Sequence, residues 1–177
     1  MTWTNSDGLY IKMGKEEGIS ALGGLPRQSG DIYEFVATIN YSEALSATAA
    51  IVDGGSDVGP YGIVIPEGLR VKEVEVFVET AFTSSGTIGS ATLALGLKQR
   101  DRSTELDHDG LLTASFVGSA LDAVGETSVV RVGSTGAGAL LGTTLSQDGV
   151  LVIANTAHAS HPYTAGKAIV RIRGYYP

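Results

Sequence analysis

Residues 71–82 read VKEVEVFVETAF and show the clearest two-residue period in this chain of 177 residues. The two faces of an extended strand here differ in chemistry: one carries Val74, Val76 and Val78, and the other carries Glu73, Glu75 and Glu79. Side chains of a strand alternate between the two faces of its sheet. Valines on one face and acids on the other are typical of an antiparallel strand with one face on a core and one in water.

Similar short segments follow along the chain, separated by glycine-rich turns. Further strands are predicted at 33–39, 63–65, 91–97, 128–132, 139–145, 149–154 and 167–176. The 24 glycines have no fixed period and fall between the apolar runs, where tight turns need positive φ. The pattern predicts an all-β fold, an antiparallel β-sandwich of jelly-roll type. Residues 42–51 fit a strand or a short helix, and 111–125 could hold a short helix.

Residues 1–31 differ from the rest because they contain six glycines and a proline and show no sustained period. They nevertheless carry large apolar side chains, which a disordered tail should lack: Trp3, Leu9, Tyr10, Ile11 and Met13. The sequence therefore predicts an extended N-terminal arm, residues 1–31, whose anchor side chains bind a partner, and a β-sandwich domain, residues 32–177. The arm could dock on its own domain or on a neighbouring subunit.

Composition argues against several classes of protein. The net charge is −7, from 12 basic and 19 acidic residues, whereas a nucleic-acid-binding protein needs a clustered basic surface. The apolar runs are far shorter than the roughly 20 residues that span a membrane as a helix. The chain has no cysteine, which excludes disulfides and thiolate metal sites. We expect neither nucleic acid nor a membrane as a partner.

Two groups of residues invite a metal-site interpretation. Alternate acids in Glu105-Leu-Asp107-His-Asp109-Gly110 are similar to the start of a calcium loop, but the twelfth position, which should be a bidentate acid, is Phe116. A looser calcium site and a solvated turn remain as alternatives. Zinc would need His108, His158 and His161 to converge. We expect no metal and no other cofactor.

The remaining patterns do not predict an enzyme. The run GSTGAGALLG at 133–142 lacks the Lys-Ser/Thr ending of a phosphate-binding loop and favours a hairpin loop or an interface turn. No serine lies in a G-x-S-x-G elbow. The regular glutamates of 71–79 indicate a solvent-exposed face better than a glycosidase pair. We therefore expect no catalytic residues.

Three stretches resemble small structural proteins of tailed bacteriophages, the decoration or cement proteins that accompany the major capsid protein. They are TNSDGLYIKMGKEEG at 4–18, the stretch from IPEGLRVKEVEVFVETAF through DHDGLL at 65–112, and VGSTGAGALLGTTL at 132–145. The resemblance runs from about Thr4 to Tyr176 and rests on overall texture, because no short motif defines this class.

The resemblance implies a β-rich homotrimer that binds the outer capsid lattice without catalysis. It also implies a place on the virion exterior after synthesis in the host cytoplasm, and it transfers no binding residues. The alternative is a receptor- or carbohydrate-binding β-sandwich module of a phage tail or fibre.

Overall fold

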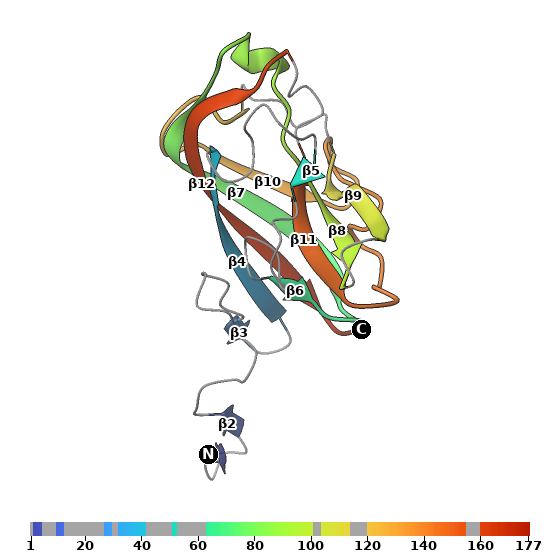
Figure 1. The fold of residues 1–177 in the computed structure, drawn as a ribbon. Helices are drawn as coiled ribbons and strands as arrows, with labels where there is room; N and C mark the ends of the chain where they lie inside the picture. The colour runs from blue at the N-terminus through green and yellow to red at the C-terminus, as the bar shows by residue number, and fades with distance from the viewer. Residues whose placement is uncertain are drawn as a thin grey trace.

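The fold is described from a computed structural model, which places residues 2–4, 10–12, 27–29, 32–41, 51–52, 63–100, 104–113, 120–154 and 160–177. These residues form two five-stranded antiparallel sheets and a separate two-stranded hairpin. Figure 1 shows the two sheets as two layers facing each other. The all-β sandwich predicted from the sequence is confirmed.

The first sheet has the order β10-β7-β12-β4-β3. Its strands are β3 (Arg27–Ser29), β4 (Ile32–Asn40), β7 (Arg70–Ser84), β10 (Thr127–Arg131) and β12 (Tyr163–Tyr175). The second sheet has the order β5-β11-β8-β9, with β6 also paired to β11. Its strands are β5 (Ile51–Val52), β6 (Val64–Ile65), β8 (Ala94–Gln99), β9 (Glu105–Leu112) and β11 (Gly149–Ala154).

This strand order is that of a jelly roll. β5 and β6 pair with opposite ends of β11 and together act as one strand, so the sandwich from β4 to β12 has eight strands in chain order. With β4 as strand 1, β5 and β6 together as strand 2, and β7 to β12 as strands 3 to 8, the order in the first sheet is 6-3-8-1, leaving out β3. The order in the second sheet is 2-7-4-5. Successive strands mostly cross between the sheets, as in the two Greek keys of a double-sheet jelly roll.

The first sheet follows the alternation seen in the sequence. In β7, Val74, Val76 and Val78 are buried in the core, and the glutamates beside them lie on the outer face. In β4 the alternate residues Phe35, Ala37 and Ile39 are likewise buried, as are the alternate residues Ala168, Val170 and Ile172 of β12. This sheet therefore has one dry face and one outer face.

The second sheet is buried on both faces at its centre. All six residues of β11 are buried, although alternate side chains of a strand point to opposite faces. Leu151 and Ile153 belong to the core between the sheets, whereas Val150 and Val152 are fully buried on the other side. A continuous apolar run is the pattern of a strand covered on both sides.

A large irregularity joins β8 to β9. Leu95 pairs with Leu112 and Leu97 pairs with Asp107, so two residues of β8 span the same stretch as five of β9. The β9 backbone at residues 107 and 108 lies so close to Gly96 that any Cβ at position 96 would overlap it. Gly96 is therefore required by the close approach of two backbones.

The strand β10 begins at a bulge. Gly125 has φ of 83°, and both Gly125 and Glu126 bond to the single residue Val78 of the neighbouring strand. A glycine in the left-handed region opposite one partner residue defines a G1 bulge, which bends a strand at its entry. The bulge fixes the register of β10 on β7, with Ser128 opposite Val76.

Three expectations about secondary structure need correction or fall outside the described residues. The segment 139–145 is a series of turns and not a strand. The acidic stretch 105–110, for which a solvated turn was one of the two alternatives, is part of strand β9. Residues 120–125 form turns and bends without an α-helix, while 114–119 and 42–50 lie outside the described residues.

Among the residues described, the structure contains no helix long and apolar enough to cross a membrane. The short element η1 (Ile88–Ser90) is a 3-10 turn after β7.

Candidate partner-binding surface

The outer face of the first sheet carries rows of opposite charges that run across the strands. In the first row, Arg173 on β12 bonds Glu34 of β4 at 2.7 Å and Glu73 of β7 at 2.8 Å. Arg131 on β10 bonds the same Glu73 at 2.9 Å. Four strands are therefore joined by one chain of ion pairs.

The second row lies one step along the sheet. Arg171 is paired with Glu75, and the Glu75 carboxylate also meets Arg173 at 3.0 Å. Further along, Lys167 pairs with Glu79 at 2.6 Å. The sequence predicted that these glutamates face outward, but it gave no sign that each one meets a cation from a strand nearly 100 residues away.

The electrostatics of the first row favour its charged state. Hydrogen bonds from Arg173 and then Arg131 lower the pKa of Glu73 below its ordinary value of 4.5. The same pairing, led by the hydrogen bond to Glu73, raises the pKa of Arg173. The Glu73 side chain is only 12% exposed, so these contacts are partly shielded from water. The row holds neighbouring strands together and leaves few free charges for a ligand.

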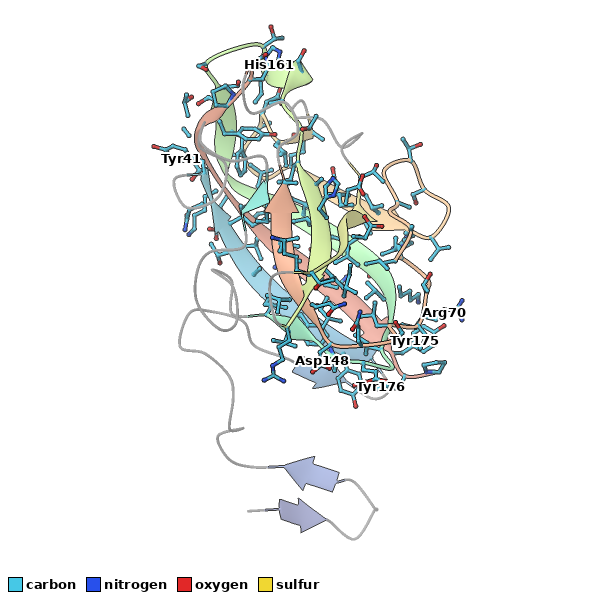
Figure 2. All side chains as sticks on the ribbon, turned by 45° about the vertical axis from the view of Figure 1, so that its right-hand side comes forward. Tyr41, Arg70, Asp148, His161, Tyr175 and Tyr176 are labelled. Atoms are coloured by element: carbon cyan, nitrogen blue, oxygen red, sulfur yellow. The ribbon has the colours of Figure 1, made fainter. Side chains whose placement is uncertain are left out.

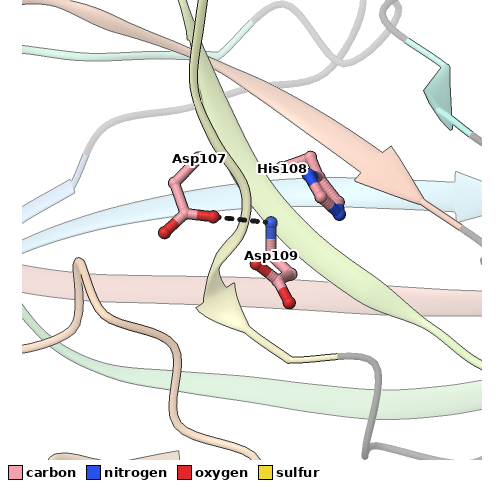
Figure 3. A group of neighbouring side chains, drawn as sticks. All are labelled: Asp107, His108 and Asp109. Carbon is pink, nitrogen blue, oxygen red and sulfur yellow. Dashed lines mark hydrogen bonds between the residues drawn. The ribbon is translucent and has the colours of Figure 1, made fainter.

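The acids and histidine of β9 form the one group of possible metal ligands found among the described residues. Asp107, His108 and Asp109 each offer one atom within 4.8 Å of the others (Figure 3). The backbone N–H of Asp109 donates to the Asp107 carboxylate at 3.3 Å, and desolvation raises the pKa of Asp107. All three are half-buried on the irregular part of β9 above Gly96.

This geometry accounts for the motif without an ion. The three residues lie where β9 makes its excursion, and a carboxylate that accepts a backbone N–H is a common way to stabilise such a bend. Glu105 is in the same strand, but its side chain lies outside the described residues. The absence of a metal stays a prediction.

The histidines do not form a common site in the described residues. His161 lies at one end of the sandwich (Figure 2), where its Nδ1 accepts the backbone N–H of Thr87 at 3.0 Å. His108 lies on β9 in the group described above, which does not include His161. His158 lies outside the described residues.

The glycine-rich run packs against its own chain. Thr113 donates its N–H to Gly136 C=O at 2.8 Å, and Leu140 donates to Gly110 C=O at 2.7 Å. Farther along, Gly142 donates to Val71 C=O at 2.7 Å. Residues 133–145 thus cover the edge of β9 and continue to β7, which is how many sheets protect an edge strand.

The predicted arm contains three short strands. β1 (Thr2–Thr4) pairs with β2 (Tyr10–Lys12) in a separate hairpin, in which Trp3 is opposite Ile11. β3, in the last part of the same segment, pairs with β4. Of the five anchors, Leu9 and Met13 lie outside the described residues, and only the backbone is described for Trp3, Tyr10 and Ile11. Their role as anchors stays a prediction.

The fold and its surfaces define a class: a jelly-roll β-sandwich with an ion-paired outer sheet. No protein-family model matches the chain, and no curated protein matches it significantly. A structure of the acid-stable capsid of Helicobacter pylori bacteriophage KHP30 matches with a TM-score of 0.48 and 12% identity, over 87% of this chain and 94% of that chain. A structure of the capsid of Ralstonia phage GP4 matches with a TM-score of 0.49 and 18% identity, over 87% and 89%. Because both TM-scores are below 0.5, the two matches carry no inference about this chain.

Proposed function

We propose that this chain is a non-enzymatic structural protein of a tailed-bacteriophage head that binds the outer surface of the capsid lattice and stabilises it. The observation that carries the proposal is the resemblance of 4–18, 65–112 and 132–145 to decoration proteins. Its partners are then the major capsid protein and other copies of itself, as a homotrimer. Its location is the exterior of the virion, after synthesis in the host cytoplasm.

The physical character of the chain supports this role. A jelly-roll sandwich with apolar residues between its sheets is a rigid body, and the ion-paired rows join four of its strands without a disulfide. A net charge of −7 keeps the free protein soluble before it meets a shell. The arm supplies apolar residues for contacts beyond the sandwich.

The glycine-rich run 133–142 does not support the trimer. An interface turn was one interpretation of this run, but several of its backbone groups bond to β9 and β7 of the same chain. The trimer is therefore proposed from the resemblance, and the surface that would join the copies has to be sought elsewhere.

The test is co-sedimentation with empty shells assembled from the major capsid protein encoded in the same genome. We expect saturable binding at a fixed ratio to the lattice and a higher melting temperature of the shells. A homologous shell from a different phage serves as the control for non-specific adhesion. Absence of binding to the matching shells would overturn the proposal.

The same purified protein can be used to test the alternative function, a receptor- or carbohydrate-binding module. A receptor- or carbohydrate-binding tail module would ignore the shells and bind defined oligosaccharides on a glycan array. Binding to glycans without binding to shells would replace the decoration role with that module.

A further inference from the structure

The strand β10 is an edge of the first sheet, and its hydrogen-bonding pattern shows which groups point outward. Val78 donates its N–H to Glu126 C=O at 2.9 Å, so residue 126 bonds toward β7. Successive residues of an antiparallel strand alternate between bonding toward a neighbour and pointing away from it. Ser128 and Val130 therefore bond toward β7, while Thr127 and Val129 present their N–H and C=O groups outward.

The next outward residue confirms this alternation and is already occupied. Arg131 accepts a bond from the N–H of Ser134 at 2.9 Å and donates its own N–H to the Ser134 hydroxyl at 3.2 Å. Thr127 and Val129 have no such partner in the part of the chain that the structure describes. Two N–H and two C=O groups thus remain open along one short strand.

Exposed valines surround this open edge. Val129 is 40% exposed on the strand itself, Val124 is 70% exposed before it and Val132 is 60% exposed after it. Three of the five large apolar side chains exposed among the described residues lie within this stretch of nine residues. An edge strand with free backbone groups and apolar side chains is a template for adding another strand.

The edge strand β9 of the second sheet, in contrast to β10, is covered by another segment of the chain. Residues 133–145 of the same chain bond to the outer edge of β9 at Gly110, Leu111 and Thr113. The chain therefore has a segment that closes the edge of its second sheet. No described segment does the same for β10.

The N-terminal hairpin is a described segment that is not part of the sandwich. β1 and β2 pair with each other and with neither sheet. Each strand has three residues, and an isolated two-stranded hairpin is at best marginally stable in water. Trp3, Tyr10 and Ile11 make the hairpin apolar by sequence, and its outer edges match the length of the open stretch 127–129.

The length of the arm allows its hairpin to reach the β10 edge of a neighbouring copy. The arm enters the sheet at β3, and β3 and β10 are the two opposite edges of the first sheet. Four strand spacings, about 19 Å, separate them across the sheet. Residues 13–26 can span up to about 50 Å when extended, which exceeds the diameter of about 40 Å expected for a domain of this size.

We propose that the β1–β2 hairpin of one copy adds to the open edge of β10 in the next copy and extends its first sheet. Donor and acceptor are different surfaces on opposite edges, so the contact is heterologous and can close into a ring. A ring of three copies meets the trimer of the proposed function, and the inference rests on that homo-oligomer but not on capsid binding.

The acceptor edge can be tested without disturbing the fold. Val129→Pro removes an outward N–H that makes no bond to β7, and proline is tolerated on an edge strand whose N–H faces away from the sheet. Val129→Thr is the matched control, because it keeps the N–H and the shape. By light scattering, we expect Val129→Pro to lower the mass threefold, from trimer to monomer, and Val129→Thr to keep the trimer. Val129→Lys, which changes no backbone group, serves as a second acceptor variant if the proline variant fails to fold.

The donor is tested in the full chain by Trp3→Ser together with Ile11→Ser, which leaves β3 and the sandwich intact. We expect this variant to be monomeric as well. Mixing it with Val129→Pro chains is the decisive measurement, because the first has an intact edge and the second an intact hairpin. The mixture should form a one-to-one heterodimer, with a mass twice that of either monomer.

Several outcomes would overturn the inference. A trimeric acceptor variant would exclude β10, and a trimeric donor variant would exclude the hairpin. Two monomeric variants that fail to combine would show that donor and acceptor do not meet. A monomeric wild-type chain that still binds capsid shells would refute the exchange and the trimer but leave capsid binding standing. A hairpin-exchanged trimer that ignores the shells would refute capsid binding and leave the exchange standing.

Discussion

The two sheets of the sandwich differ in their outer faces, because one is charged and the other is buried. The first sheet turns a charged face outward and neutralises it with ion pairs from four strands. The second sheet buries both faces of its central strands, so that Val152 is as inaccessible as Leu151. The outer face of the first sheet is therefore independent of any covering layer, whereas the second sheet depends on one.

The largest expected effect comes from placing an aspartate on the outer face of the second sheet, and the same residue on the outer face of the first sheet is the control. Val152→Asp would bury an unpaired carboxylate in the second sheet and should cost about 5 kcal/mol or more, enough to prevent folding. Thr38→Asp, at an exposed site on the outer face of the first sheet, should change stability by less than about 0.5 kcal/mol. Urea unfolding measures both, and equal effects would abolish the distinction between the sheets.

A smaller effect should follow from filling the space beside Gly96. The Cβ of Gly96→Ala would overlap the β9 backbone, so the two strands must separate, at a cost of about 1–3 kcal/mol. Gly89→Ala is the control, because no atom lies within 4 Å of a Cβ there. If both alanine variants melt like the wild type, the close contact of β8 and β9 does not exist in solution.

The ion-paired row should give a moderate and pH-dependent effect. Glu73→Gln weakens two charge-assisted hydrogen bonds and should cost about 1–2 kcal/mol at pH 7. Because the folded-state pKa of Glu73 is lowered, its contribution is present above pH 4.5 and is lost as the pH falls through the folded-state value. The difference in stability between wild type and variant should therefore shrink in acid. A difference that stays constant down to pH 2 would contradict this assignment.

The smallest effect is expected at the outer end of the same face. Lys167 and Glu79 form an ion pair whose side chains are 43% and 33% exposed. Lys167→Gln should therefore cost less than about 0.5 kcal/mol, and 1 M salt should remove most of that cost. A loss as large as that of Glu73→Gln would mean that exposure does not rank these pairs.

Because β3 lies within residues 1–31 and pairs with β4, the role of the hairpin should be tested by a shorter deletion. Deleting residues 1–31 would remove β3 from the first sheet together with the hairpin, so a folding defect would have two causes. Deleting residues 1–12 removes only the hairpin and should leave the melting temperature of the sandwich within a few degrees, as measured by calorimetry. A much larger loss would show that the hairpin stabilises its own domain.

The sequence by itself determined the class of the fold and the faces of its clearest strands. The valines and glutamates of 71–79, the inward residues of 33–39 and the run 149–154 all express a two-residue or continuous apolar pattern, and such patterns depend only on neighbours in the chain. The tertiary structure alone decided which glutamate meets which arginine, why position 96 must be glycine and why 133–145 closes one edge while β10 stays open. Those features join residues up to 139 positions apart, as in the bond between Glu34 and Arg173, and their geometry depends on strand register and backbone approach, which no local pattern records.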